Sequence, residues 1–542
     1  SGGVVDLVAD GSIVDGLQNS EVDVNGALGI SLRASNGFIG DSGYLEIVSG
    51  TNSPVFAQAK GVVALSSTVG DLRIDSITSQ TAGVNLVSAG SIIDHNNSAA
   101  ADIVAATGVW LTATNGGSIG DIDNLEIETS DGAPVNATAP GNVRLRELTN
   151  DMAVQWVQSS QGIVYLQSAR SIVDALNSDA VDVFAGGSVE LAAGTGSIGD
   201  ISALEVDTGA TGLLKASAQG NIRVRELTGD LLLDRISSVG GTVSLTSAKS
   251  ILDGLGDSDA DILGVSAVLI ASAGSIGASD KPVQTDLVQA GGGSLSATAT
   301  GDVNLGETVD DFLAGTISTS TGVIRVTSSA GIVNGGSGVV NFNAPDIRLV
   351  SANLGTTINR LVYEQPKTTG TAVTSFTTTT TGDQYLKFVS STANRVSGIP
   401  VNNAYLTNLV STQGVIDLDS EAPIQVVSVS STAAGVKLKS AYSINDANSS
   451  PAPDIIGFTG IDLESVNGTI GESGAGLEVV QGPTGSLKAR AVGTVWLVQT
   501  ANDMRVDSVI SIAGTARLYS YGSIIDAFSD TGTDVTGVSI DL

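Results

Sequence analysis

Short runs in which apolar and polar residues alternate recur along the whole chain, separated by glycine-rich or polar turns. Residues 143–148, Val-Arg-Leu-Arg-Glu-Leu, alternate in this way, and similar short runs occupy residues 84–87, 91–93 and 102–104. A period of two places one set of side chains in a core and the other in water, which is typical of a half-buried β-strand. The pattern therefore predicts an all-β chain of short strands separated by tight turns.

One pentapeptide, Gly90-Ser91-Ile92-Ile93-Asp94, returns at a near-constant interval. The successive steps are 79, 80, 79, 81, 112 and 80 residues, because its copies end at Asp15, Asp94, Asp174, Asp253, Asn334, Asp446 and Asp526. Two further motifs, Ser118-Ile119-Gly120-Asp121 and Gly70-Asp71, have counterparts in most repeats. A fixed period of this kind indicates a repeat protein whose units bury their apolar faces against their neighbours. Three motifs per period predict about three coils per ~80-residue repeat.

Stacked coils of short strands define the expected fold, a right-handed parallel β-helix or β-solenoid, since parallel connections are right-handed. Regular repeats are expected over residues 1–321 and again over 435–542. The long step makes 322–434 an irregular unit, with room for one additional coil or a projecting loop at 355–413. Solenoids need capping segments, and the chain shows none, so we expect a fragment of a longer chain.

The charge balance narrows the range of partners. Asp and Glu number 56 against 24 Lys and Arg, which gives a formal net charge of −32. Such a charge repels phosphate backbones, so we expect no nucleic-acid partner. It suits a soluble extracellular surface, and it would equally suit bound Ca²⁺ or a salty medium. No apolar run is long enough to span a membrane, and the absence of cysteine excludes disulfides and thiolate sites.

In six repeats a second aspartate follows the pentapeptide aspartate after eight residues. The pairs are Asp15 and Asp23, Asp94 and Asp102, Asp174 and Asp182, Asp253 and Asp261, Asp446 and Asp454, and Asp526 and Asp534. Neighbouring carboxylates could bind Ca²⁺ or act as acid and base in glycoside hydrolysis, or they could simply fix the corner by accepting backbone hydrogen bonds. Active sites occur once, so we expect corner fixing and no catalytic residues, with Ca²⁺ as the one cofactor left open.

The irregular unit contains the candidate recognition element. Residues 355–413 include a threonine-rich run and the aromatic residues Tyr363, Phe376, Tyr385 and Tyr405. Loops that interrupt a rigid scaffold often carry binding residues. We therefore expect these four aromatic residues to form a binding loop, although a plain variable loop is the alternative.

The segment from Gly241 to Asp253, Gly-Thr-Val-Ser-Leu-Thr-Ser-Ala-Lys-Ser-Ile-Leu-Asp, and its counterparts share the pattern G-x-[V/I]-x-L-x-[S/A], followed in most repeats by G-S-I. This repeat pattern resembles the repeats of filamentous haemagglutinin-type adhesins and related giant bacterial surface proteins. The resemblance implies a right-handed β-helix exported to the cell surface as a stalk or adhesin. The chain departs from the family in its regular period near 80 residues and in having no recognisable secretion domain.

These observations predict a non-enzymatic extracellular structural or adhesive protein, a stiff rod segment of a large secreted bacterial surface protein. Its expected partners are further copies of itself or a host or neighbouring cell surface. Two alternatives remain. A self-assembling extracellular filament or sheath subunit would form end-to-end polymers. A β-helix polysaccharide lyase or hydrolase would need a single cleft in which carboxylates and basic residues converge.

Overall fold

All regular structure in the described part of the chain is β. The computed structural model describes residues 2–40, 43–120, 122–288, 292–336, 339–364, 374–390, 395–396, 399–400, 405–448, 450–472 and 474–542. These residues form 56 strands and no helix. The strands stack in parallel as a β-solenoid of about 22 turns, as the sequence predicts. Two compact units result, unit 1 (residues 1–256 and 261–268) and unit 2 (257–260 and 269–542).

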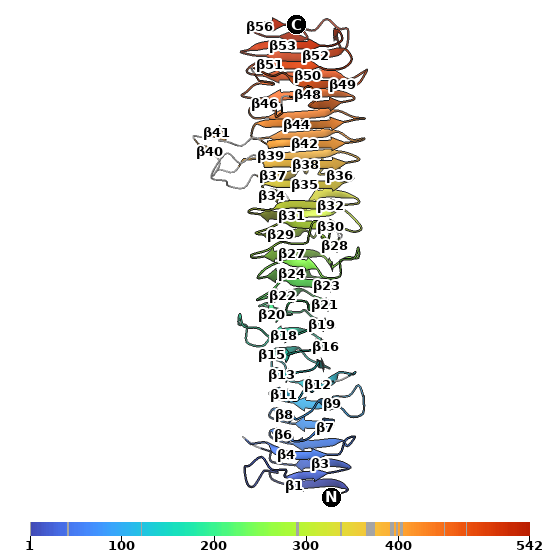
Figure 1. Ribbon diagram of the computed structural model, residues 1–542, viewed down its shortest axis with the longest axis vertical. Helices are drawn as coiled ribbons and strands as arrows, with labels where there is room; N and C mark the ends of the chain where they lie inside the picture. Colours follow the sequence, from blue (N-terminus) through green and yellow to red (C-terminus); the bar gives the residue numbers. More distant parts are fainter. Residues whose placement is uncertain are drawn as a thin grey trace. The chain divides into compact units, whose positions relative to one another are not determined.

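Unit 1 consists of two parallel sheets whose strands alternate along the chain (Figure 1). The first sheet contains β1 (Val4–Ala9), β3 (Gly29–Ala34), β5 (Val55–Ala59), β7 (Leu72–Ser79), β9 (Ile92–Asp94), β10 (Ile103–Ala105), β12 (Leu125–Thr129), β14 (Val143–Glu147), β16 (Val164–Ser168), β19 (Val189–Ala193), β21 (Leu213–Ala218), β23 (Leu231–Ser238), β25 (Ile251–Asp253) and β26 (Ile262–Gly264). The second contains β2 (Val24–Gly26), β4 (Leu45–Ser49), β6 (Val63–Ser67), β8 (Val84–Ser88), β11 (Val109–Ala113), β13 (Pro134–Ala139), β15 (Met152–Ser159), β17 (Ile172–Asp174), β18 (Val183–Ala185), β20 (Leu204–Asp207), β22 (Ile222–Glu226) and β24 (Thr242–Ser247).

Unit 2 repeats this arrangement, and β27 (Ser266–Ala271) contributes residues to both units. Its first sheet contains β28 (Val283–Leu287), β30 (Val303–Glu307), β32 (Val323–Ser328), β35 (Asp346–Ser351), β38 (Thr374–Thr380), β42 (Tyr405–Ser411), β44 (Ile424–Ser431), β46 (Ile444–Asp446), β47 (Ile455–Gly457), β49 (Leu477–Gln481), β51 (Val495–Gln499), β53 (Thr515–Ser520) and β56 (Ser539–Asp541). The second contains β29 (Leu295–Ala299), β31 (Phe312–Thr319), β33 (Gly331–Asn334), β34 (Phe342–Asn343), β36 (Asn353–Leu354), β37 (Leu361–Glu364), β39 (Gln384–Val389), β43 (Ile416–Ser420), β45 (Val436–Ser440), β48 (Gly460–Ser465), β50 (Ser486–Ala491), β52 (Met504–Ser511), β54 (Ile524–Asp526) and β55 (Val535–Thr536).

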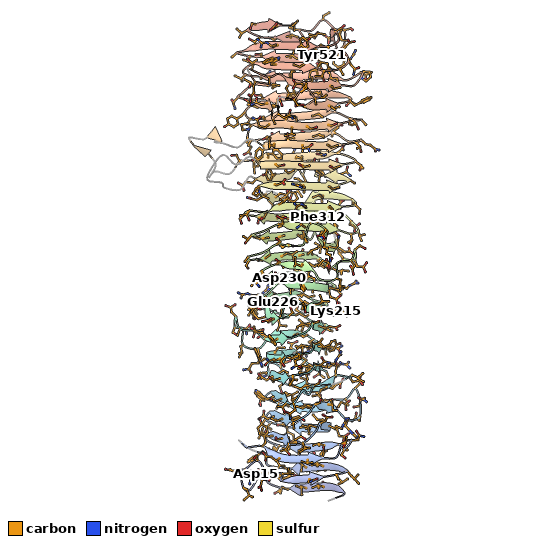
Figure 2. The ribbon with its side chains drawn as sticks, in the orientation of Figure 1. Asp15, Lys215, Glu226, Asp230, Phe312 and Tyr521 are labelled. Carbon is orange, nitrogen blue, oxygen red and sulfur yellow. The ribbon has the colours of Figure 1, made fainter. Side chains whose placement is uncertain are left out.

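The core of each unit is built from columns of stacked apolar side chains. In unit 1 one column passes through β6, β8, β11, β13 and β15, and its members, all fully buried, are Val63, Val84, Val109, Val135 and Val154. In unit 2 Phe312 of β31 is equally buried and lies within the stack of strands in Figure 2. Because successive turns pair in parallel and in register, each repeat places like residues above like, and the core continues from turn to turn.

The pentapeptide and the second motif stack directly on each other. Ile92 pairs with Ile119 one turn further on, and Ile119 pairs with Val143 in the next turn. Gly120, which follows Ile119, has φ 66°, and a Cβ at this position would lie 2.6 Å from the carbonyl oxygen of Arg144. Only glycine tolerates both the conformation and the close approach, which explains why this motif carries glycine after its isoleucine.

Equivalent strands of successive repeats lie in opposite sheets. In unit 1, β7 and β23 belong to the first sheet, whereas β15, which is equivalent to them, belongs to the second. Seven strand positions separate β7 from β15, counting β9 and β10 as one, and each turn supplies two. One repeat therefore spans three and a half turns, which refines the predicted value of about three.

The long interval in the repeat contains one further turn. From β31 to β44 the chain passes through nine strand positions of the two sheets, whereas the equivalent interval of a regular repeat has seven. In this count β33 with β34, and β36 with β37, are one position each. Between β39 and β42 the antiparallel pair β40 (Arg395–Val396) and β41 (Ile399–Pro400) leaves the two sheets. The described part of 355–413 thus supplies strands to both sheets, and most of the threonine run forms β38. In its described residues the segment adds one turn to the solenoid and places the pair β40 and β41 outside the two sheets.

Candidate functional site

The pentapeptide aspartate closes a tight turn at the corner of its coil. One carboxylate oxygen, Oδ1, accepts a hydrogen bond from the backbone N–H two residues further on. The distances are 2.8 Å from Asn96 to Asp94, 2.7 Å from Leu176 to Asp174, and 2.8 Å from Asn448 to Asp446. Aspartate favours such turns because its short side chain reaches the backbone just ahead of it. Each of these aspartates therefore fixes the path of the chain.

The second aspartate of four pairs, Asp23, Asp102, Asp182 and Asp454, lies just before the next strand and accepts a hydrogen bond from the backbone of the following turn. Its Oδ2 accepts the N–H of a glutamate there. This bond joins Asp102 to Glu126 at 2.9 Å, and its equivalents join Asp182 to Glu205 and Asp454 to Glu478 at 3.0 Å each. The strand register thus brings a third carboxylate to the corner.

Three acidic side chains consequently converge at each of these corners. In each group one oxygen per residue lies within 4.8 Å of the others. Three groups have buried aspartates and are called the buried triads here, although Glu478 itself is half-buried: Asp94, Asp102 and Glu126; Asp174, Asp182 and Glu205; and Asp446, Asp454 and Glu478. Two more exposed groups are Asp15, Asp23 and Glu46, and Asp526, Asp530 and Asp534. The sequence predicted the aspartate pairs but missed the glutamates. A Leu-Glu-Ile or Leu-Glu-Val tripeptide, whose glutamate lies 31 or 32 residues after the first aspartate, is the signal that marks them.

The pair Asp253 and Asp261 does not form such a group among the described residues. The residue 31 positions after Asp253 is Gln284, whereas Glu205 holds the same position relative to Asp174. This repeat retains both aspartates and carries an amide in place of the third carboxylate.

Burial disfavours the ionised state of the second aspartate of each triad and of two of the three glutamates. Burial and, to a smaller extent, the neighbouring carboxylates raise the pKa of Asp102, Asp182 and Asp454 to about 8 each, while the N–H of the following glutamate opposes the rise. Burial also raises the pKa of Glu126 and Glu205. Three carboxyl groups in close contact cannot all ionise without a counter-charge.

The aromatic residues predicted to form a binding loop are mostly buried. Tyr363, Phe376 and Tyr405 pack with Phe388 in the core of the added turn, with ring centroids between 4.7 and 5.4 Å apart. The hydroxyl groups of Tyr363 and Tyr405 donate to backbone carbonyls at 3.0 Å each. These three residues lie in strands and face inward, because every second residue of a strand does so. Only Tyr385 reaches the surface.

Tyr385 begins a row of outward side chains on the second sheet of unit 2. The register aligns Tyr385, Asp417, Lys437, Asp462 and Lys488 on β39, β43, β45, β48 and β50. A groove of about 490 Å³ runs over this row. Burial raises the pKa of Asp462, and Lys437 and Lys488 oppose that rise.

Arg360 of the added turn reaches the start of this groove. Its guanidinium forms an ion pair with Asp417 at 2.7 Å and lies 6.0 Å from the ring centroid of Tyr385. With Arg360 the groove therefore combines an aromatic ring, two carboxylates and three cationic groups on six adjacent turns, and this combination was not predicted from the sequence.

Comparison with protein-family models, with curated proteins and with solved structures gave no match to the chain. The fold itself defines the class: the chain is a β-solenoid repeat protein. None of its described residues lies in a helix that is long and apolar enough to cross a membrane.

Proposed function

We propose that the chain is a non-enzymatic structural or adhesive segment of a secreted bacterial surface protein, and that it acts outside the cell. The observation that carries this proposal is repetition. The same buried triad of two aspartates and a glutamate occurs in three repeats with the same backbone hydrogen bonds. Catalytic sites are few per protein, whereas groups that stabilise a solenoid recur with its repeat.

The groove over Tyr385 is the proposed contact surface for a host or neighbouring cell. It departs from the repeat, since it begins at the added turn, and it gathers lysine side chains on a strongly acidic chain. Exposed tyrosine with flanking charges supplies both apolar contact area and polar specificity at interfaces.

A cell-attachment assay tests this proposal. Fluorescently labelled protein is incubated with bacterial and host cells, and the double variant Tyr385→Ala/Lys437→Glu is compared with Lys215→Glu, which changes an exposed lysine in unit 1. We expect the wild type and Lys215→Glu to attach equally and the groove variant to lose most of its attachment. Equal attachment of all three would overturn the role of the groove, and no attachment of the wild type would overturn the adhesive assignment.

The same groove supports a second candidate, an enzyme that acts on polysaccharides. Asp417 and Asp462 lie two turns apart, which corresponds to about 9.6 Å at the strand spacing. This separation is close to the range for the acid and base of inverting glycoside hydrolases, about 6.5 to 9.5 Å. The pKa of Asp462, which burial raises, suits a proton donor.

A depolymerisation assay separates the two candidates. We expect acidic and neutral polysaccharides to keep their length on incubation with the wild type, as followed by size-exclusion chromatography. Chain shortening that is abolished in Asp462→Asn, and retained in the matched surface variant Asp419→Asn, would establish the enzyme instead.

A further inference from the structure

The buried triads hold carboxylate oxygens that no protein group satisfies. In the first triad Asp94 and Asp102 are 8% and 1% exposed, yet Asp94 Oδ2 and Asp102 Oδ1 have no hydrogen-bond partner. The same holds for Glu205 Oε2 in the second triad, and for Asp446 Oδ2, Asp454 Oδ1 and Glu478 Oε2 in the third. A buried, unpaired carboxylate oxygen is costly, so these atoms indicate a missing positive partner.

Two buried carboxylates outside the triads, Glu147 and Glu226, have partners for both of their oxygens. Oε2 of Glu147 accepts from the backbone and hydroxyl of Thr129, and its Oε1 accepts from Thr149 and Asn150. Glu226, labelled in Figure 2, has the equivalent four bonds. The fold thus provides partners for all four oxygens of Glu147 and Glu226, whereas in the triads several oxygens stay unpaired; Glu307 Oε1 is also unpaired.

The irregular repeat shows how the same corner is built without charge. Asn334 and Asn341 replace the two aspartates, and the position of the glutamate holds Val362, whose N–H donates to Asn341 Oδ1 at 2.9 Å. Asn341 Nδ2 donates to Asn334 Oδ1 at 3.1 Å, and Asn334 Nδ2 donates to the carbonyl of Arg360 at 3.0 Å. Here the corner closes through its own hydrogen bonds, so a corner of this kind can be built without three carboxylates.

Arginines near two triads compensate at most part of their charge. Arg146 Nη1 lies 3.9 Å from Glu126 Oε1, and Arg225 Nη1 lies 4.0 Å from Glu205 Oε1. One guanidinium leaves two of three ionised carboxylates unbalanced, and neither arginine reaches the unpaired oxygens.

The spacing of the oxygens selects the size of the partner. Because the three oxygens of a triad are at most 4.8 Å apart, there is always a point that lies within about 2.8 Å of each of them. Ca²⁺ binds oxygens at about 2.3 to 2.6 Å in flexible geometry, whereas Mg²⁺ requires about 2.0 to 2.1 Å and a strict octahedron. Carboxylates without histidine or cysteine are ligands for hard cations of this kind. We propose that each of the three buried triads binds one divalent cation of the size of Ca²⁺.

A surface hollow provides access to the first triad. A cavity of about 340 Å³ is lined by the polar residues Asp94, His95, Asn97 and Asp123, and also by Arg73, Ile93 and Ile122. A hydrated cation can therefore reach Asp94 from solvent and lose its water on entering the triad, and water in the hollow can complete its coordination.

Calcium titration of the intact chain tests this proposal. Protein freed of metal with a chelator is titrated with CaCl₂ by calorimetry, and its melting temperature is followed in parallel, with MgCl₂ as the comparison. We expect saturable binding of Ca²⁺, a rise in melting temperature, and a weaker response to Mg²⁺. No binding isotherm and no thermal shift at about 10 mM CaCl₂, well above the dissociation constants of extracellular calcium sites, would overturn the proposal.

Two single substitutions change the number of sites in opposite directions. Glu126→Gln removes a carboxylate from the first triad, and we expect the number of bound ions to fall by one. Gln284→Glu supplies the missing carboxylate beside Asp253 and Asp261, and we expect the number to rise by one. Because Gln284→Glu removes no ligand, it remains informative if Glu126→Gln folds poorly. An unchanged number of ions in folded samples of both variants would show that the triads are not the sites.

Discussion

Individual buried acids are the residues at which this fold departs most from an ordinary β-solenoid core. Glu307 at the end of β30 is 5% exposed, and its Oε2 accepts a hydrogen bond of 2.9 Å from Thr285. Burial raises its pKa to about 7, although the bond from Thr285 opposes the rise. The native state therefore holds a proton on Glu307 at pH values at which an unfolded chain has released it.

This proton makes stability depend on pH in a defined direction. Because the pKa of Glu307 is raised on folding, its contribution is fully present below about pH 4.5 and is lost as pH rises through about 7. Glu307→Gln keeps a neutral group in place at every pH. The melting temperature of the variant, relative to that of the wild type, should therefore rise between about pH 5 and pH 8. Thermal unfolding in chelator-containing buffers measures this, with Glu21→Gln as the exposed control. A difference that stays constant across this range would contradict the assignment.

The added turn is the element that interrupts the repeat, and an aromatic cluster stabilises it. Phe388 contacts Tyr363, Phe376 and Tyr405 through edge-on and tilted rings, at a level where the regular repeats have aliphatic columns. Four rings fill more volume than the valines and isoleucines of the other turns. The cluster therefore suits a turn that has no counterpart in the regular repeats.

Removing one ring should destabilise this turn locally. Phe388→Ala should cost about 3 to 5 kcal/mol of unfolding free energy, because it leaves a cavity among three aromatic rings. Hydrogen exchange should report the loss mainly in β37, β38, β39 and β42, since a solenoid transmits stability chiefly between neighbouring turns. Tyr385→Ala, on the same strand but facing outward, is the matched control and should cost less than about 1 kcal/mol. Similar exchange rates in the two variants would argue against the cluster.

The strands and their stacking could be predicted from the sequence because alternation and the repeat period encode them directly. The value of three and a half turns per repeat could not be predicted, because the three motifs mark only some of the seven strand positions. Short strands such as β2 and β18 carry no motif. The inward direction of Tyr363 and Phe376 was missed for a similar reason. The threonine run around Phe376 suggests a loop, whereas in the structure it alternates as a strand.

The two aspartates of each triad could be predicted from the sequence, whereas the glutamate could not. Asp94 and Asp102 stand eight residues apart and share one corner, so local spacing reveals them. Glu126 lies 24 residues beyond Asp102 and joins it only through the register between neighbouring turns. That register follows from the stacking of whole coils, which no local pattern specifies.

At the scale of the whole molecule, the apolar core of each unit is combined with a large excess of negative charge. The formal net charge of −32 is spread over 542 residues, and the ion pairs among the described residues involve few of the acidic groups. Like charges repel one another most strongly when the chain is folded, so the charge opposes the folded state while it keeps the protein soluble.

Screening this charge should stabilise the fold. Raising NaCl from about 0.1 M to about 1 M shortens the screening length from about 10 Å to about 3 Å, and the melting temperature in metal-free buffer should rise. KCl should act equally, because the effect depends on ionic strength. A fall in melting temperature with both salts would show that attractive ion pairs outweigh the repulsion.

The three and a half turns of each repeat also bear on how such a chain can lengthen. Duplication of a single repeat moves every later surface residue to the opposite sheet. Duplication of two repeats, the 159-residue interval between Asp15 and Asp174, returns each of these residues to its original sheet. The added turn of the long interval supplies two strand positions and leaves this parity unchanged. Related chains that keep their binding residues on one sheet should therefore gain repeats in pairs, or gain whole turns. Whether repeats were added in odd or even numbers then shows which surfaces selection has kept.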